Sequence, residues 1–380
     1  MKQFIYADNA ATTKMSDVAV KAMLPYLQEI YANASSVHLL GQRSAAALFS
    51  ARQQVAQVLN CAPKEVFFTS GGSEADNQAL ISAAAIGKKQ GKCHIVSTAM
   101  EHHAILHTLE ALQAEGFTVT LLRPQADGIV TATQVAEAIT DTTCLVSVMY
   151  ANNETGAIQP IREIGALCRK RGVLFHTDAV QAAGHLAIDV QRDNIDMLSL
   201  SAHKFHGPKG IGLLFAKSNI QLTSLIRGGG QERGKRAGTE NLPGIIGLTA
   251  ALKDAQENMQ QNTAYIKGLR DALRNGLDKI DGAGFNGSRE HCLPGTVNYS
   301  FLGVNGETLL SLLSNEGICC SSGSACSAGS LEPSHVLLAL GLSHEMAQSA
   351  LRFSLCEYNT IDEVQTIITK VTEAVNRLRR

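Results

Sequence analysis

The sequence lacks several features that would place it in a specialised class of protein. Its 33 basic and 34 acidic residues leave a formal net charge of −1, so it has no basic excess of the kind that non-specific nucleic-acid binding requires. No apolar run approaches the ~18 residues that cross a bilayer. The first residues, MKQFIYADNAATT, hold no secretory leader. We therefore expect a cytoplasmic protein that binds neither nucleic acid nor membrane.

Cysteine is too sparse for a disulfide framework, and low-complexity linkers and repeats of fixed period are missing. Nine cysteines in 380 residues are an odd number, and in a reducing compartment they are expected to be thiols. The chain does have 45% hydrophobic and 18% charged residues, a balance typical of globular proteins. At ~150 residues per domain, its length indicates about two domains.

Short apolar runs alternate with helical patterns over the first half of the chain. Helix-length segments such as 74–90, 102–115 and 161–171 separate several of these runs. The strand candidates are 66–69, 94–97, 118–121, 144–148, 173–176, 197–200 and 211–215. Near-continuous apolar strands with helices between them predict an α/β fold whose mainly parallel sheet is covered on both faces.

The second half of the chain has a different pattern. A long helical stretch runs from about 241 to 280, and short strands such as 295–301 then mix with helices. Residues 361–378 place apolar side chains on one helical face. We predict a large α/β domain over residues 15–255, and a smaller α+β domain formed by residues 1–14 together with 256–380.

One glycine-rich segment follows a predicted strand, at the edge where parallel sheets gather their ligands. Ser70-Gly71-Gly72-Ser73 opens a helix, so its backbone amides could hold a phosphate. A Walker loop is excluded because no Gly-Lys-Ser/Thr follows. The plainer alternative is a glycine turn with an ordinary helix cap.

Three reactive side chains follow neighbouring strands. His102 could stack on a planar ligand, and Asp178, directly after a buried strand, needs a cationic partner such as a protonated ring nitrogen. Lys204, beside His203, could form a Schiff base. The plainer interpretations are a structural histidine, a helix cap and a loop lysine. Together with the glycine-rich segment, these residues are the set that a pyridoxal 5'-phosphate enzyme needs.

Ten short motifs occur in order over residues 6–355. They are YADNAATT, NASSVH, TSGGSEADN, EHHAIL, YANNETG, HTDAVQAAG, SAHKFHGPKGIG, GGGQERGKRAGTEN, SSGSACSAG and LRFSL. Together they resemble the NifS/IscS-type cysteine desulfurases, a family of fold-type I, class V aminotransferase-like pyridoxal phosphate enzymes. The resemblance implies a homodimer that removes sulfur from L-cysteine, leaves L-alanine and passes the sulfur as a persulfide to an acceptor protein, either an iron–sulfur scaffold or a thiolation enzyme.

The resemblance also assigns cofactor-binding roles. Lys204 would hold the cofactor covalently, Asp178 would pair with its ring nitrogen, and His102 would stack on the ring and help to move protons. The residues implied to hold the phosphate are Gly72, Ser73, Ser201 and His203, with Thr239 reaching in from the partner subunit. The residues implied to contact the ring oxygen are Asn153 and Gln181.

Substrate binding and sulfur transfer are assigned in the same way. Arg352, with Asn153, would bind the substrate carboxylate in a forked geometry, and Asn33 is also implied at the substrate site. Cys326 matches the catalytic cysteine, and its glycine, serine and alanine neighbours favour a mobile loop. No resident metal is expected, although Cys326 could be a transient iron–sulfur ligand.

The sequence departs from the family pattern in two places that matter for sulfur transfer. Cys319 and Cys320 stand where small or aliphatic residues are more common, and they could be packed or could shuttle sulfur. Housekeeping members carry an extra tail beyond the position of Arg380, which leaves the sulfur acceptor open. The alternatives are a selenocysteine lyase, another fold-type I enzyme such as an aminotransferase, and a non-catalytic assembly factor that binds thiols or metal through Cys319, Cys320 and Cys326.

Overall fold

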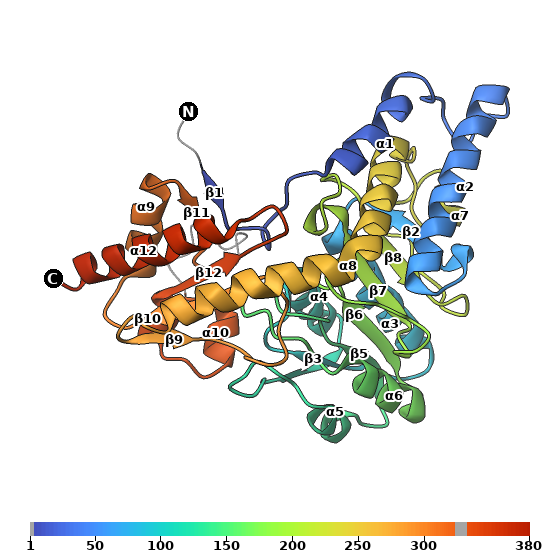
Figure 1. The fold of residues 1–380 in the computed structure, drawn as a ribbon. Coiled ribbons are helices and arrows are strands. Elements are labelled where there is room, and N and C mark those ends of the chain that lie inside the picture. The colour runs from blue at the N-terminus through green and yellow to red at the C-terminus, as the bar shows by residue number, and fades with distance from the viewer. Residues whose placement is uncertain (1–3, 324–332) are drawn as a thin grey trace.

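The computed structural model describes residues 4–323 and 333–380. A seven-stranded sheet of order β2-β8-β7-β6-β5-β3-β4 is the centre of its larger body (Figure 1). Strands β7, β6, β5, β3 and β4 run parallel, whereas β8 is antiparallel to both of its neighbours. The strands are β2 (Val66–Thr69), β3 (His94–Thr98), β4 (Thr118–Leu122), β5 (Thr143–Ser147), β6 (Leu174–Asp178), β7 (Met197–Ser201) and β8 (Gly212–Ala216). The predicted mainly parallel sheet is confirmed.

Helices pack on both faces of this sheet, which explains why every residue of β2, β3, β5, β7 and β8 is buried, whereas the edge strand β4 is partly exposed. Ile95 and Leu145 pack with the helices α3 (Gly72–Lys89) and α4 (His103–Ala114). Val96 and Val146, the next residues along the same two strands, join a separate core on the other face. That core takes most of its helical side chains from α2, α6 and the first part of α8 (Leu242–Leu277), with single residues from α1, α5 and α10 (His335–Ala339). The other helices of the larger body are α1 (Asp17–Gln28), α2 (Leu39–Leu59), α5 (Ala132–Ala138), α6 (Ile161–Arg171) and α7 (Gln231–Gly234).

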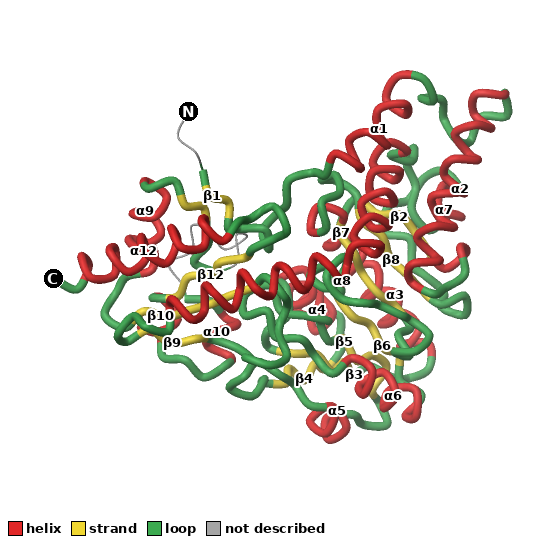
Figure 2. Tube along the Cα trace, in the orientation of Figure 1, coloured by secondary structure: helices red, strands yellow, loops and turns green. Residues whose placement is uncertain are grey.

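The helix α8 (Leu242–Leu277) has 36 residues and connects the larger body with a smaller one (Figure 2). Leu248, near its start, is buried in the core of the larger body, and Leu273, near its end, is buried in that of the smaller body. In the middle of the helix, none of residues 253–265 has a buried side chain. The connecting helix expected at about 241–280 is therefore present.

The smaller body contains a three-stranded antiparallel sheet, β12-β10-β9. Residues from the start of the chain belong to this body, since β1 (Ile5–Tyr6) pairs with β11 (Ile318–Cys319) and Ala7 lies in its core. The other elements are β9 (Ala283–Phe285), β10 (Thr296–Phe301), β12 (Ala350–Ser354), α9 (Gly306–Asn315), α10 (His335–Ala339), α11 (His344–Gln348) and α12 (Ile361–Leu378). The exact domain boundaries stay a prediction.

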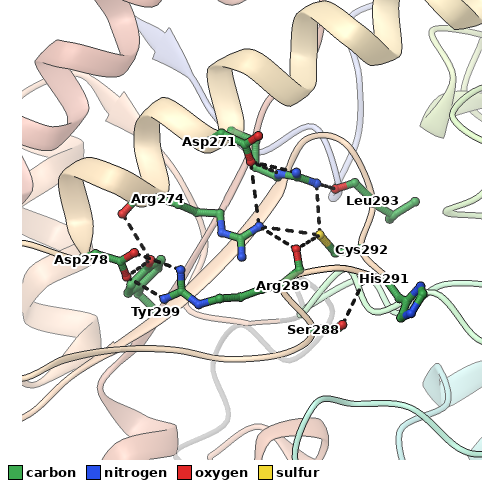
Figure 3. A network of polar contacts seen from close by, with 10 residues as sticks. Asp271, Arg274, Asp278, Ser288, Arg289, His291, Cys292, Leu293 and Tyr299 are labelled. Carbon is green, nitrogen blue, oxygen red and sulfur yellow. Dashed lines mark hydrogen bonds and ion pairs between the residues drawn. The ribbon is translucent and has the colours of Figure 1, made fainter.

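A polar network ties the end of α8 to β10 and to the segment before it (Figure 3). Arg289 donates to Asp278 (2.8 Å), and the Tyr299 hydroxyl donates to the same carboxylate (2.6 Å). Cys292 Sγ lies 3.9 Å from a guanidinium nitrogen of Arg274.

None of the helices in the described part of the chain combines the length and the apolarity that a membrane crossing needs.

Candidate active site

A cavity lies beyond the carboxyl ends of β6 and β7, where β12 of the smaller body faces the start of α3. Ten of the residues predicted from the sequence line it: Gly72, Ser73, His102, Asn153, Asp178, Gln181, Ser201, His203, Lys204 and Arg352. The lining also includes residues that the sequence did not single out: Ala10, Ala11, Asp76, Met149, Ala151 and Val180.

The start of α3 has the geometry of an anion site. The helix begins at Gly72, and a Cβ atom there would come within 2.7 Å of a methyl group of Val180, so only glycine lets the helix pack this closely on the turn after β6. The first amides of a helix have no acceptor within it, and the helix dipole favours negative charge there. Because this end faces the cavity, it suits a phosphate group.

Asp178 is the last residue of β6 and is 7% exposed. Burial raises the pKa of its carboxyl group to about 6, against the opposing effects of the Val180 N–H, which donates to Oδ1 (2.9 Å), and of the Lys204 ammonium. A carboxylate that is costly to ionise in this position gains from a cationic ligand group. Asp178 is therefore suited to bind a protonated ring nitrogen.

Lys204 ends a short 3₁₀ turn, Ala202–Lys204, that directly follows β7. Its Nζ atom donates hydrogen bonds to the carbonyl oxygens of Ala10 (2.6 Å) and Ala11 (2.7 Å). The N-terminal segment is itself anchored to this turn, since Thr13 donates to the carbonyl of His203. The chain start thus positions the amine inside the cavity.

The two histidines of the cavity are neutral at pH 7. Burial and the positive charge of Lys204 lower the pKa of both His102 and His203 to about 4. His102 caps α4 and accepts a hydrogen bond from the Ala104 N–H at Nδ1 (3.1 Å), so the proton of the neutral ring is on Nε2. His203 Nδ1 lies 3.1 Å from the Thr12 hydroxyl. A neutral ring suits stacking and proton exchange better than a permanent charge would.

Arg352 brings a cation into the cavity from β12. Its side chain is 1% exposed, and it donates to a carboxylate oxygen of Asp8 (2.8 Å) and to the Asn153 carbonyl (3.0 Å). Its Nε atom has no hydrogen-bond partner among the described residues. A buried guanidinium with an unused donor is costly unless a ligand completes it, which is consistent with carboxylate binding.

Asp76 is a buried acidic group that the sequence reasoning missed. It lies on α3, is 1% exposed, and has its Oδ1 atom 3.7 Å from His176 Nε2. Burial and the nearby Asp178 raise the pKa of its carboxyl group well above the ordinary range. The signal in the sequence was its position within TSGGSEADN, one turn after Ser73.

The remaining predicted residues lie elsewhere. Asn33 and Thr239 are exposed and do not appear among the described residues that line the cavity. Cys326 lies outside the described residues. Burial raises the pKa of both the Cys319 and the Cys320 thiols, and Cys320 packs against the core of the smaller body. Both are therefore held as thiols at neutral pH.

Comparison with known proteins gives concordant results. A model of the aminotransferase class-V family matches residues 5–367. The chain is 47% identical over 382 residues to a protein named cysteine desulfurase IscS from Clostridium botulinum strain Hall, covering 100% of this chain and 96% of the relative. It is 45% identical over 375 residues to a protein of the same name from Methanosarcina thermophila, covering 99% and 93%.

Solved structures agree with this fold. A NifS-like protein superposes with a TM-score of 0.93 at 37% identity, covering 99% of this chain and 100% of the other. A structure described as SspA in complex with cysteine superposes with a TM-score of 0.82 at 38% identity, covering 93% and 99%.

Proposed function

This chain belongs to the aminotransferase class-V family, and we propose that within it the chain acts as a cysteine desulfurase that uses pyridoxal 5'-phosphate to convert L-cysteine into L-alanine and bound sulfur. The observation that carries the proposal is that Lys204, Asp178 and Arg352 line one cavity. An amine, a buried carboxylate and a buried guanidinium are needed for the cofactor carbonyl, its ring nitrogen and an amino-acid carboxylate respectively.

The residues of the cavity fit this cofactor. Asp178 is a buried carboxylate whose raised pKa reflects the need for a cation, and no side chain caps the amide end of α3. Asp178 would meet the ring nitrogen, and His102 would stack on the ring. The phosphate would be held by Gly72, Ser73, Ser201 and His203, and the ring oxygen by Asn153 and Gln181.

The side chains of the cavity have distinct tasks in this reaction. When bound, the cofactor supplies an electron sink for the substrate Cα. Arg352 binds the substrate carboxylate, and Asp8 and the Asn153 carbonyl hold the guanidinium in place. Lys204 Nζ takes the proton from the substrate Cα and returns it to a neighbouring atom, while His102, neutral at pH 7, exchanges protons with it.

Cys326 would receive the sulfur. Its thiolate attacks the substrate sulfur, so that an S–S bond forms, the Cβ–S bond breaks, and the electron pair and a proton end on the carbon that becomes the alanine methyl group. This role rests on the motif SSGSACSAG. The persulfide would then be passed to an acceptor protein, an iron–sulfur scaffold or a thiolation enzyme.

A product assay tests the assignment. Purified holoenzyme given L-cysteine is expected to release one L-alanine for each sulfur atom removed from the substrate. L-Selenocysteine and keto acids are assayed separately as alternative substrates. Turnover confined to selenocysteine would identify a selenocysteine lyase, and turnover of keto acids an aminotransferase. Either result would overturn the desulfurase assignment.

A homodimer and a cytoplasmic location are also part of the proposal. Large apolar side chains of α1, α2 and the segment between them are exposed, among them Leu24 (53%), Tyr31 (70%) and Val37 (90%). An apolar surface of this extent indicates a protein partner, and a second copy would let Asn33 and Thr239 reach the neighbouring cavity. Every cysteine in the described ranges is a free thiol, which supports a reducing compartment.

The dimer can be tested by placing charges on α1. We expect the wild-type protein to sediment as a dimer, and the double variant Leu24→Glu/Leu27→Glu to sediment mainly as a monomer, because two buried carboxylates would be left unpaired. Ile361→Glu, at an exposed apolar position of α12, is the control and should remain dimeric. A double variant that stays dimeric would place the interface elsewhere.

Arg352→Lys is expected to raise KM for cysteine by about 10- to 100-fold, because the forked hydrogen bonds to a charged carboxylate, about 1.5–3 kcal/mol, cannot be replaced by one ammonium group. The change in kcat should be smaller. Steady-state kinetics measure both, with Arg289→Lys, an exposed arginine outside the cavity, as control. An unchanged KM would remove Arg352 from substrate binding.

Asp178→Asn should stabilise the cofactor-free protein and weaken cofactor retention. Burial raises the Asp178 pKa from 3.8 to about 6, so the folded state holds this proton more tightly than the unfolded state does. The contribution of this proton to the free energy of unfolding is fully present below about pH 3.8 and is lost as the pH rises through about 6. At pH 8 the variant should therefore gain about 1–3 kcal/mol in urea unfolding, with less gain at pH 5. A less stable variant at pH 8 would contradict this account.

A further inference from the structure

A second cluster of potential ligand groups lies beside the turn that carries Lys204. His206, Cys356 and Glu357 bring an imidazole nitrogen, a thiol sulfur and a carboxylate oxygen within 4.8 Å of one another. His206 and Cys356 are buried, and the Glu357 side chain is 25% exposed. The mechanism proposed above uses none of these groups.

The ring of His206 is held in a fixed orientation. Its Nδ1 atom lies 2.8 Å from the Lys14 carbonyl oxygen, and because a carbonyl can only accept, Nδ1 carries the hydrogen. The Tyr358 ring packs edge-on against it, with the ring centroids 5.1 Å apart. Histidines that bind metals typically donate their other N–H group to a carbonyl or carboxylate in this way.

The second nitrogen of His206 points into the cluster. Nε2 is buried, makes no hydrogen bond with any described residue, and lies 3.4 Å from Glu357 Oε2. With the hydrogen of the neutral ring on Nδ1, Nε2 keeps a lone pair that can bind a ligand shared with the Cys356 sulfur and a Glu357 oxygen, which lie within 4.8 Å of it. In the metal-free protein the groups within its reach are the Cys356 thiol and the Glu357 carboxylate.

In the absence of a metal, a proton can satisfy the same groups. Burial alone would lower the pKa of His206, but Cys356 and Glu357 raise it to about 10, and His206 lowers that of Glu357 against the effect of burial. An imidazolium–carboxylate pair is therefore the competing explanation. A metal ion would have to displace this proton, so metal binding should release protons.

We propose that His206, Cys356 and Glu357 form a binding site for a divalent metal ion of borderline softness, with Zn²⁺ as the best match. Nitrogen, sulfur and oxygen ligands are the set that Zn²⁺ accepts, and three protein ligands leave a fourth position for water, which can enter past the partly exposed Glu357. Mg²⁺ and Ca²⁺ are disfavoured, because they prefer oxygen ligands.

The site would connect two segments that line the catalytic cavity. His206 follows Lys204 by two residues, and Cys356 follows Arg352 by four. Cys356 also lines a small neighbouring cavity together with Ala10 and Gln181, both of which line the main cavity. A bound ion would thus fix the Lys204 turn against the end of β12 without contacting the substrate.

Metal titration of chelator-treated holoenzyme tests the proposal. A Cys326→Ser background removes the thiol proposed to be reactive. Calorimetry with Zn²⁺ in buffers of different ionisation enthalpy is expected to give one ion per chain with proton release. Co²⁺, used as a coloured substitute, should give visible absorption bands of a four-coordinate site with a sulfur ligand. Turnover is not needed for either readout, so the result is independent of the desulfurase assignment.

Substitutions at the cluster decide the outcome. Cys356→Ser and His206→Gln should each weaken Zn²⁺ binding by about 100-fold or more, since even indirect partners of metal ligands are worth about 10- to 100-fold. Cys292→Ser replaces a similarly buried thiol outside the cluster and should leave binding unchanged. If His206→Gln fails to fold, Glu357→Gln takes its place. The absence of Zn²⁺ binding, or binding unaffected by these variants, would mean that the cluster is only an ion pair.

Discussion

Replacing Lys204 with alanine is expected to stop alanine release from L-cysteine, lowering kcat by about 10²–10⁴-fold or more, the range that a positioned proton-transfer group contributes. The amine is directed into the cavity by the carbonyls of Ala10 and Ala11, and no other lysine lines that cavity within the described part of the chain. Alanine release and the visible absorbance of the cofactor are the two measurements.

The matched control for Lys204 is Lys209→Ala, an exposed lysine five residues further along the chain. It should keep both activity and colour. Borohydride treatment of the wild-type protein should bleach the colour and leave the cofactor attached to the chain, and Lys204→Ala should lose this attachment. Full activity in Lys204→Ala would refute the assignment, and a colourless wild-type protein would favour the non-catalytic assembly factor.

Cys326→Ser is expected to keep the cofactor and the binding of cysteine but to lose sulfur transfer, with a fall in turnover on the order of 10³-fold or more, as for other covalent nucleophiles. A serine hydroxyl cannot accept sulfur as a persulfide. Mass spectrometry of the wild-type protein after incubation with cysteine should show one added sulfur that a thiol reductant removes, and the variant should show none.

Cys320→Ser provides the comparison for this prediction, because burial raises the pKa of the Cys320 thiol and makes its thiolate scarce at neutral pH. Its turnover should stay close to that of the wild-type protein. A Cys326→Ser variant with full desulfurase activity, or sulfur found on Cys320 instead, would contradict the persulfide step as proposed.

Much of the fold could be predicted because the inner strands of the large sheet are buried on both faces. Val96 and Ile95 belong to different cores, so an inner strand carries adjacent apolar residues instead of a strict apolar–polar alternation. The helices α6 (Ile161–Arg171) and α12 (Ile361–Leu378) have the predicted limits. The helix α12 buries the single face of Val364, Ile367, Val371 and Val375, which gives a clear helical period.

Other elements could not be predicted, because the signals that define them are weak in the sequence or lie far apart along the chain. The helices α1 and α2 expose apolar residues such as Leu24 and Leu39, which blurs the helical period. Asp8 and Arg352 form an ion pair across 344 residues, and the carbonyls that orient Lys204 come from the chain start. No local pattern could indicate these contacts.

The site was easier to predict than its surroundings. Asp178 ends β6 and Lys204 follows β7, and because these neighbouring strands are parallel, their carboxyl ends lie at one edge of the sheet and place the two residues together. Asp76 was missed because an acid on the first turns of a helix is ordinary in a sequence, and its significance depends on burial beside Asp178.

The long helix α8 has a mechanical consequence. Lys204 belongs to one body and Arg352 to the other, and only the stretch 253–265 of α8, about 20 Å long at ~1.5 Å per residue, lies between the two cores. Its central turns bear on neither core, so a helix-breaking residue there would leave both cores intact while altering the gap between amine and guanidinium. The separation of Lys204 and Arg352 is therefore held by α8 together with the direct contacts between the bodies, such as those of Lys204 with the Ala10 carbonyl and of Arg352 with the Asn153 carbonyl.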